Sequence, residues 1–335
     1  MSTAHRLDIS TAPFLHQGRN TSRVMLEVLM ALVPVIISAV YFFGVSALML
    51  IAVTVLACVL TEASLAKDGI NFGVLKDNSA LLTGVLLGLT LPPATPLWVA
   101  ALGGIIAMVL GKAIWGGLGQ NMFNPALVGR AFLQAAFPSL MTTWTLPESF
   151  LDVAPSTFAV PLMSAQADVV TAATPLALSK FEGKVTEVGP LFFGNTAGSL
   201  GETAGVIILL CGLYLIYRKI FDWRLMVSTL LSVAIFAAIL HQVDPKAYPG
   251  PEFMLLSGGL MFGAVYMVTD PVTTPITSKG AWIFGAGVGV LVVLIRLWGG
   301  LPEGVMFSIL LMNSVTPLIN RYTQPRPFGS KATPK

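Results

Sequence analysis

Charged residues are scarce in this sequence. Only 10% of its 335 residues are Asp, Glu, Lys or Arg, whereas 55% are hydrophobic. Soluble domains usually contain about 25% charged residues, so the composition excludes an ordinary soluble enzyme and favours an all-α polytopic membrane protein. The formal net charge of +3 gives no indication of a nucleic-acid partner. The expected surroundings of the chain are the lipid bilayer.

Metal-binding residues are also few. The two cysteines, Cys58 and Cys211, each lie inside an apolar run, and the three histidines are scattered. Such a set cannot form a zinc or iron–sulfur site from this chain alone. We therefore expect two buried thiols without a disulfide, and any metal would have to be bound by a partner subunit.

The N-terminus lacks the apolar core of a cleaved signal peptide. Residues 1–23 are therefore expected to form a cytoplasmic segment, and the first apolar run should remain as a membrane span. Ten apolar segments follow, most of them near the roughly 20 residues that a helix needs to cross a bilayer. These segments are 24–43, 45–62, 79–91, 97–113, 125–140, 201–218, 224–241, 254–269, 281–297 and 304–320.

The positions of the positive charges favour one orientation. With the N-terminus in the cytoplasm, most of the 19 Lys and Arg residues fall in cytoplasmic loops. The positive-inside rule then predicts that both termini are cytoplasmic. It also predicts that the polar interval 141–200 lies on the opposite side of the membrane.

Two short sequences recur in the same order. LPPATP at 91–96 resembles DPVTTP at 270–275, and IWGGLGQ at 114–120 resembles LWGGLPE at 297–303. Equivalent points are separated by five predicted spans, an odd number, so the two copies would face opposite ways. This pattern predicts two inverted five-helix repeats with broken half-helices; chance similarity between loops rich in Gly and Pro is the alternative.

The expected organisation of the chain follows from these features. It comprises a cytoplasmic segment 1–23, a first membrane repeat 24–140, an external insertion 141–200, a second membrane repeat 201–320 and a cytoplasmic tail 321–335.

The insertion contains the sequence DVVTAAT at 168–174, which matches the pattern D-x-x-[ST]-[GA]-A-T. An ordinary loop, with Asp168 or Thr171 capping a short helix, would explain the acid and the first threonine. Five constrained positions nevertheless make a chance match rare, on the order of one in several hundred. Because Pro175 follows, Thr174 is expected to be extended.

This motif resembles the flavinylation signal of a family with two branches, the B subunits of Na⁺-translocating NADH:quinone reductases and the D subunits of Rnf complexes. GQNMFNPALVGRAF and SGGLMFGAVYMVTDPVTTPITSKG resemble further signatures of that family. The resemblance implies FMN joined to Thr174 by a phosphodiester, with Asp168 and Thr171 recognised by a separate flavin transferase. The short segment before the first span favours the Rnf branch.

The resemblance also implies a function. The chain would be a flavoprotein of the bacterial inner membrane, with its flavin in the periplasm and no complete active site of its own. It would relay electrons between ferredoxin and NAD through other Rnf subunits, coupled to Na⁺ or H⁺ translocation. The alternatives are the quinone-reductase branch and a small-solute or ion transporter with inverted repeats, because a fold alone does not decide function.

A second candidate site lies in GQNMFNPALVGR at 119–130. Asn124 and Pro125 are a favourable N-cap and first residue for a helix that begins at membrane depth. With Asn121, this helix start could bind a polar ligand, and the resemblance implies a non-covalent riboflavin nearby. A capped half-helix that packs against its repeat partner is the alternative. Arg130, on the same helix, should have a buried acidic partner.

Five other charged residues receive simpler interpretations. Glu27 and Asp270 are the candidate partners of Arg130, although Glu27 could equally be an interfacial carboxylate and Asp270 part of a turn. Lys112, Arg296 and Glu303 lie at predicted span ends, where we expect their side chains to reach toward the membrane surface.

Overall fold

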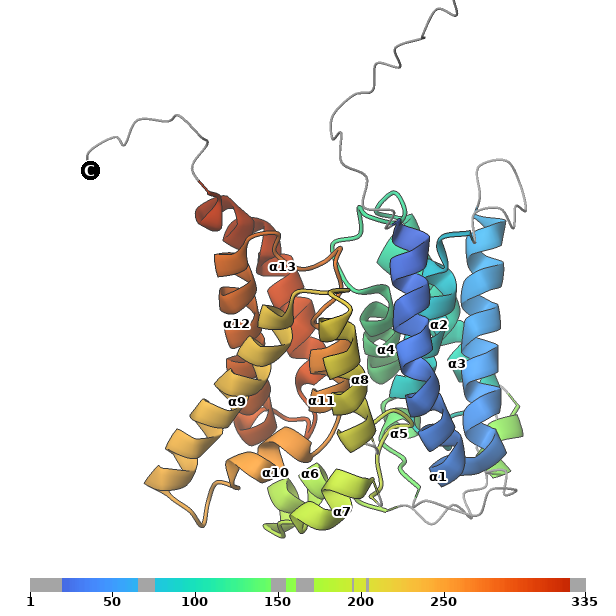
Figure 1. Cartoon of the computed structure of the whole chain (residues 1–335). Helices are drawn as coiled ribbons and strands as arrows, with labels where there is room; N and C mark the ends of the chain where they lie inside the picture. The colour runs from blue at the N-terminus through green and yellow to red at the C-terminus, as the bar shows by residue number, and fades with distance from the viewer. Residues whose placement is uncertain are drawn as a thin grey trace, which may run out of the picture.

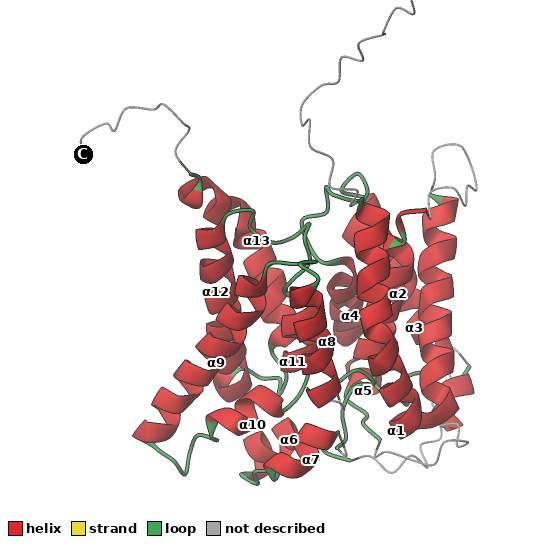
Figure 2. Ribbon diagram, viewed as in Figure 1, coloured by secondary structure: helices red, strands yellow, loops and turns green. Residues whose placement is uncertain are grey.

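The computed structural model describes residues 20–65, 76–145, 155–160, 172–194, 196–202 and 205–325. Within these ranges the chain is mostly helical and contains no strand (Figure 2). The helical elements are α1 (Thr21–Ser64), α2 (Ser79–Thr90), α3 (Leu97–Met108) with a π turn (Val109–Ala113), α4 (Pro125–Ala136), α5 (Pro138–Met141), a 3₁₀ turn (Pro155–Phe158), α6 (Pro175–Ala177) with a π turn (Leu178–Glu182), α7 (Val188–Phe193), α8 (Gly205–Tyr217), α9 (Trp223–Val243), α10 (Pro251–Leu256), α11 (Leu260–Phe262) with a π turn (Gly263–Met267), α12 (Ser278–Trp298) and α13 (Val305–Thr323).

Several of these helices have the composition of membrane spans. α1, α9 and α12 are long and apolar enough to cross a bilayer, and α2, α3 and α8 are shorter apolar helices. Large apolar side chains remain exposed on the outer faces, among them Ile37 on α1 and Ile239 on α9. A helix that is apolar on its outer face is suited to lipid. The chain is therefore a mostly helical, polytopic membrane protein, as its composition predicts.

Helix α1 contains the first two predicted spans. Gly44 separates them with φ 66° and ψ −155°, a region of backbone conformation that is essentially restricted to glycine. At this residue the chain reverses its direction, so the two limbs of α1 run side by side (Figure 1).

Two predicted spans are broken. The segment 125–140 divides into α4 and α5 at Phe137 (φ −133°, ψ 58°), because Pro138 disfavours a helical conformation in the residue before it. The segment 254–269 divides into α10 and α11, with Gly258 at φ 63° between them. A Cβ at Gly258 would collide with Glu303 and would lie 2.6 Å from Leu176 Cδ1.

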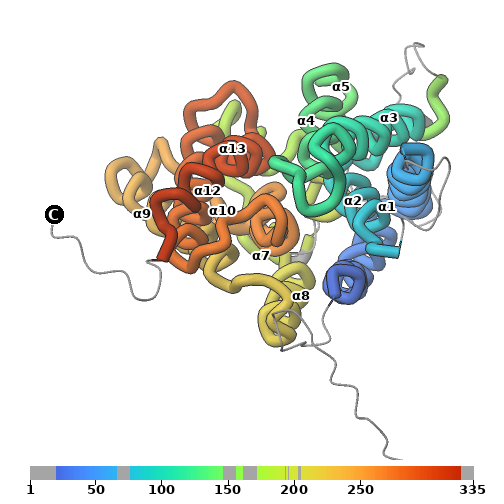
Figure 3. The backbone as a smooth tube through the Cα atoms, turned by 90° about the horizontal axis from the view of Figure 1, so that it is seen from above, coloured from blue at the N-terminus to red at the C-terminus, as the bar shows by residue number. Residues whose placement is uncertain are grey.

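The helices have two distinct ends. The start of α1 and the end of α13 both lie at the top of Figure 1, on opposite sides of the molecule, and we call this the terminal end. α6, α7 and α10 lie at the opposite end, called here the insertion end. Seen from above, α1 to α5 form one group and α9 to α13 another (Figure 3).

Candidate functional site

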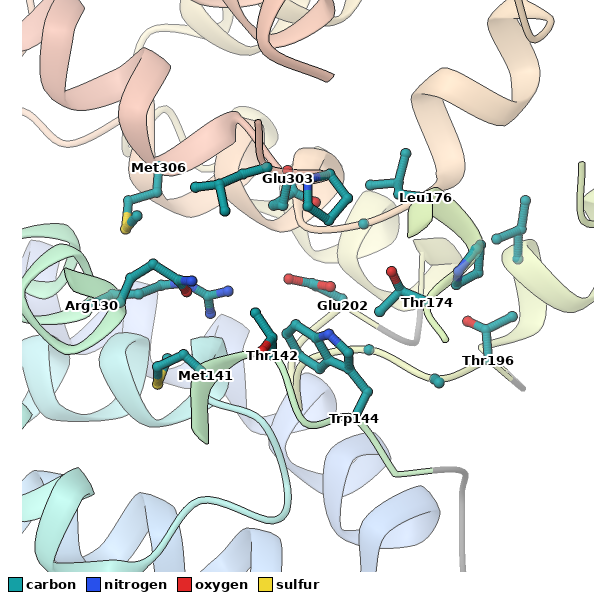
Figure 4. Close-up of a pocket in the computed structure, with 18 of the residues that line it drawn as sticks. Arg130, Met141, Thr142, Trp144, Thr174, Leu176, Thr196, Glu202, Glu303 and Met306 are labelled. Atoms are coloured by element: carbon teal, nitrogen blue, oxygen red, sulfur yellow. The ribbon is translucent and has the colours of Figure 1, made fainter. Parts of the chain in front are cut away.

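A cavity of about 840 Å³, partly open to solvent, lies at the insertion end. Its walls come from α4, from the segment around α6, from the loop before α8 and from the turn between α12 and α13. Its polar lining includes Arg130, Gln134, Thr142, Trp144, Thr174, Thr196, Glu202 and Glu303. Thr174 of the sequence motif and helix α4 therefore contribute to one cavity, which we call the insertion-end cavity (Figure 4).

Thr174 lies at the start of α6 and lines this cavity. Its backbone is extended (φ −66°, ψ 153°), as expected for a residue that precedes proline. Its hydroxyl oxygen accepts a hydrogen bond from the backbone N–H of Ala177 at 3.2 Å. Asp168 and Thr171 lie outside the described residues.

Hydrogen bonds join the segment around Thr174 to the loops that follow α5 and α12. The N–H of Ala172 donates to the carbonyl of Trp144 at 2.9 Å. Lys180 Nζ donates to the carbonyl of Leu301 at 3.0 Å and also to that of Gly299, just beyond the end of α12. A cation is favourable at this end of a helix, although partial burial lowers the pKa of Lys180. These contacts keep Thr174 facing the cavity.

Arg130 lies on the wall of the cavity across from Thr174. It is 7% exposed, and its Nη1 has no hydrogen-bond partner among the described residues. Figure 4 shows the carboxylate of Glu202 between the guanidinium group and Thr174. Glu202 and Glu303 are the acids that act electrostatically on Arg130, and neither forms an ion pair with it in the described part of the chain.

The prediction that Glu27 or Asp270 pairs with Arg130 is therefore wrong. Glu27 is buried and pairs with Arg218, whose Nη2 lies 3.0 Å from Glu27 Oε1. Asp270 is part of a turn, as its simpler interpretation predicted. Its carboxylate accepts hydrogen bonds from Val272 N–H and the Thr273 hydroxyl. Both acids are at the terminal end, whereas Arg130 faces the cavity at the insertion end.

Arg296 is buried, contrary to the expectation that it reaches toward the membrane surface, and the partly exposed Glu303 contacts it. Arg296 is 3% exposed and donates to the carbonyls of Met254 and Ser257, at 2.6 and 2.9 Å, and to Glu303 at 3.3 Å. The break between α10 and α11 frees these carbonyls from helical hydrogen bonds. The second oxygen of Glu303 accepts from Gly259 N–H at 3.1 Å.

Lys112 is also buried instead of reaching the surface. It is 5% exposed and contacts the Glu62 carboxylate and the Ser79 hydroxyl, with Asp77 3.9 Å away. Sequence position alone did not indicate this contact, because Glu62 and Lys112 are brought together only by the packing of α1 against α3.

Lys112 lines a second cavity, of about 760 Å³, at the terminal end. Asn121 and Asn124 also line this terminal-end cavity, as do Asp270 and the buried Tyr266. Both asparagines of the second candidate site thus face the same space. The cavity is bounded by α1, α2, α8 and the start of α4, so segments distant in the sequence form it together.

The two asparagines have different roles in the structure. Asn124 caps α4, since its Oδ1 accepts from the N–H of Ala126 at 3.1 Å and of Leu127 at 3.4 Å. This confirms the predicted helix start. Asn121 donates to the carbonyl of Phe123 at 3.2 Å, but its Oδ1 is buried without a partner among the described residues. A buried acceptor of this kind is satisfied when a ligand donates to it.

Sequence reasoning missed Glu202 and Lys180. Glu202 stands just before the apolar run of α8, much as Glu303 stands before α13, and this shared position was a signal that could have identified both. Lys180 gave no such signal, because its acceptors lie more than 100 residues later. The thiols of Cys58 and Cys211 are free and buried, as expected, and the described residues contain no group of three metal-ligating side chains.

The fold is that of a mostly helical membrane protein, with one cavity at each end of its described helices. The chain belongs to the NQR2, RnfD, RnfE family, which its residues 8–329 match.

Named relatives extend over nearly the whole chain. It is 40% identical over 333 residues to the D subunit of the proton-translocating ferredoxin:NAD(+) oxidoreductase complex of Clostridium ljungdahlii, with 96% of each chain covered. It is 41% identical to the D subunit of the Na(+)-translocating ferredoxin:NAD(+) oxidoreductase complex of Acetobacterium woodii, covering 96% of this chain and 95% of that one. The D subunit of an ion-translocating oxidoreductase complex of Stutzerimonas stutzeri is 41% identical, with 94% of each covered.

Proposed function

We propose that this chain is the D-type membrane subunit of an Rnf-type electron-transport complex, and that it relays electrons through FMN joined covalently to Thr174. The observation that carries this proposal is that the predicted flavin-bearing threonine lines a cavity and faces a buried arginine across it. The names of the relatives support the rest: electrons pass between ferredoxin and NAD through partner subunits, coupled to translocation of Na⁺ or H⁺.

The residues around Thr174 suit attachment by a separate enzyme. A threonine hydroxyl is a weak nucleophile unless a base activates it, and the described residues that line the cavity include no His or Cys. We therefore propose that a flavin transferase recognises Asp168 and Thr171 and forms the bond between Thr174 Oγ1 and phosphorus. Bound in this way, FMN would supply one- or two-electron chemistry at a fixed position.

The topology proposed from the sequence fits the arrangement of the helices. The chain would cross a bacterial inner membrane about ten times, with both termini in the cytoplasm and the flavin-bearing insertion in the periplasm. The two inverted repeats are supported by a shared feature. Lys112 and Arg296 each stand just before a WGGL sequence, and each is a buried cation, one at the terminal end and the other at the insertion end.

The terminal-end cavity is proposed to hold a second, non-covalent flavin, riboflavin. The unpartnered Oδ1 of Asn121 supports this assignment, since riboflavin carries several hydrogen-bond donors and no phosphate. Asn124 would act mainly by capping α4 and so fixing the wall against which the ligand lies.

Intact-mass measurement tests the covalent flavin. The full chain, produced together with a flavin transferase, should gain the mass of one FMN, and Thr174→Ala should remove that increment. Thr196→Ala is the matched control, because Thr196 lines the same cavity outside the motif, and it should retain the flavin. An unmodified wild-type chain, or flavin retained in Thr174→Ala, would contradict the proposal. Quinone reduction by the purified complex would instead indicate the NADH:quinone reductase branch.

A further inference from the structure

Arg130 is a buried cation whose environment leaves it incompletely paired. Its side chain projects from α4 into the insertion-end cavity, and its Nη1 has no partner among the described residues. Burying an unpaired charge is costly, and charged residues within membrane helices usually mark functional sites. Arg296 is better satisfied, because three acceptors surround its guanidinium group and only its Nε lacks a partner among the described residues.

The two acids near Arg130 have other partners. Glu303 accepts hydrogen bonds from Arg296 and from the N–H of Gly259. Glu202 accepts from the N–H of Ser199 at 3.3 Å. The net charge of this cluster of two arginines and two glutamates is zero when all four are ionised, but the hydrogen-bonding capacity of Arg130 remains available to a ligand in the cavity.

The chemistry of a flavin identifies what such a cation would contact. When an isoalloxazine accepts two electrons and one proton, the proton binds at N5, and a negative charge is left on N1 and the C2 carbonyl. In this complex the electrons would come from partner redox subunits and the proton from solvent. A positive charge beside N1 stabilises the reduced form and raises the reduction potential, which is one of the ways a protein tunes a flavin.

We propose that Arg130 contacts the isoalloxazine ring of the flavin carried by Thr174 and stabilises its reduced, anionic form. This inference rests on the proposed attachment of FMN to Thr174. The position of Arg130 favours the ring over the phosphate, because the phosphate is tied to Thr174 on one wall and Arg130 faces it from the other (Figure 4). Glu202 lies between them, and its negative charge acts in the opposite direction.

The sign of the charge gives a direct test. Wild-type and variant chains are produced in full length with the transferase, and intact-mass measurement first establishes that FMN is attached. The flavin is then titrated electrochemically. Arg130→Gln should lower the equilibrium constant for two-electron reduction at least tenfold, which is about 30 mV. Arg130→Lys should recover most of this loss, and Glu202→Gln should shift the constant in the opposite direction.

Gln134→Leu serves as the matched control, since Gln134 is neutral, lies one turn further along α4 and lines the same cavity. Because this substitution removes no charge, it should shift the potential much less than Arg130→Gln. An unchanged potential in Arg130→Gln, or shifts of the same sign in Arg130→Gln and Glu202→Gln, would overturn the inference while leaving the attached flavin in place. If Arg130→Gln does not fold, Glu202→Gln is titrated both below and above the pH at which Glu202 ionises, because a potential that fails to rise where Glu202 is charged contradicts the proposed field. A wild-type chain without FMN would overturn both proposals.

Discussion

The two cavities are similar in size but differ in how their cations are satisfied. The insertion-end cavity contains Arg130, whose guanidinium group lacks a partner at Nη1 among the described residues. The terminal-end cavity contains Lys112, which contacts both Glu62 and Ser79. Their volumes are about 840 and 760 Å³, so size does not distinguish them. The unpartnered Nη1 of Arg130 does, because it leaves a charged hydrogen-bond donor available to a ligand at the insertion end.

This difference matches the two proposed flavins. FMN carries a phosphate and becomes more negative on reduction, so a covalent bond and an available cation both suit the insertion-end cavity. Riboflavin is uncharged, and an amide acceptor such as Asn121 can bind it without a buried counter-charge. A polar insertion outside the helices also exposes Thr174 to a modifying enzyme, which a threonine within the helix bundle would not allow.

Denaturation should separate the two flavins completely, and this is the largest expected effect. Acid precipitation of the loaded protein should leave FMN on the polypeptide and release riboflavin into the supernatant, because only the first is covalently bound. Thr174→Ala should leave the released fraction unchanged and abolish the retained one. Chromatography of both fractions measures this. If all of the flavin is retained, or all of it is released, the two cavities do not differ in how they bind flavin.

The two cations should respond differently to removal of their charge. Lys112→Met leaves the Glu62 carboxylate buried without its partner, and breaking a buried pair in this way costs about 3–5 kcal/mol. Arg130→Met removes a charge that forms no ion pair in the described structure and should cost less than Lys112→Met. Thermal unfolding of the purified proteins, without added flavin, compares the two. Equal losses would show that Arg130 is as fully satisfied as Lys112.

Substitutions of the two asparagines of the terminal-end cavity should have different effects, one on protein stability and the other on flavin binding. Asn124→Ala removes the cap of α4 and should destabilise the protein by about 1 kcal/mol. Asn121→Ala removes no cap, so it should weaken retention of the released flavin with little change in unfolding temperature. Flavin content after dialysis and thermal unfolding give the two readouts. The prediction fails if Asn124→Ala leaves stability unaltered.

The smallest expected effect concerns the anchor of the insertion. Lys180→Met removes the donor that holds the segment after α6 to the carbonyls of Gly299 and Leu301, at a cost of about 0.5 kcal/mol. Limited proteolysis should cut the insertion faster while leaving the terminal-end cavity and its flavin intact. Lys184→Met is the control, because Lys184 is exposed and pairs only with Glu182 in the described region. Equal cleavage of both variants would exclude an anchoring role for Lys180.

Local features of the fold were predictable because they depend on neighbouring residues. Asn124 and Pro125 begin a helix where the sequence indicates one, and Pro175 leaves Thr174 extended. The partners of Arg130 were predicted wrongly, because the choice among acids depends on which end of the helix bundle each one occupies. The burial of Lys112 and Arg296 was missed for a related reason, since their acceptors come from helices that pack against them and from a break between α10 and α11.

The amino-acid sequence by itself determined the membrane class, the family resemblance and the residue proposed to carry the flavin, because hydrophobic composition and a contiguous motif need no knowledge of distant contacts. Only the tertiary structure decided that Thr174 shares a cavity with Arg130, Glu202 and Glu303. These residues lie far apart in the sequence, and hydrogen-bonding and electrostatic interactions act through space. Their effect on a bound cofactor is therefore set by how the helices pack, a property that no single segment encodes.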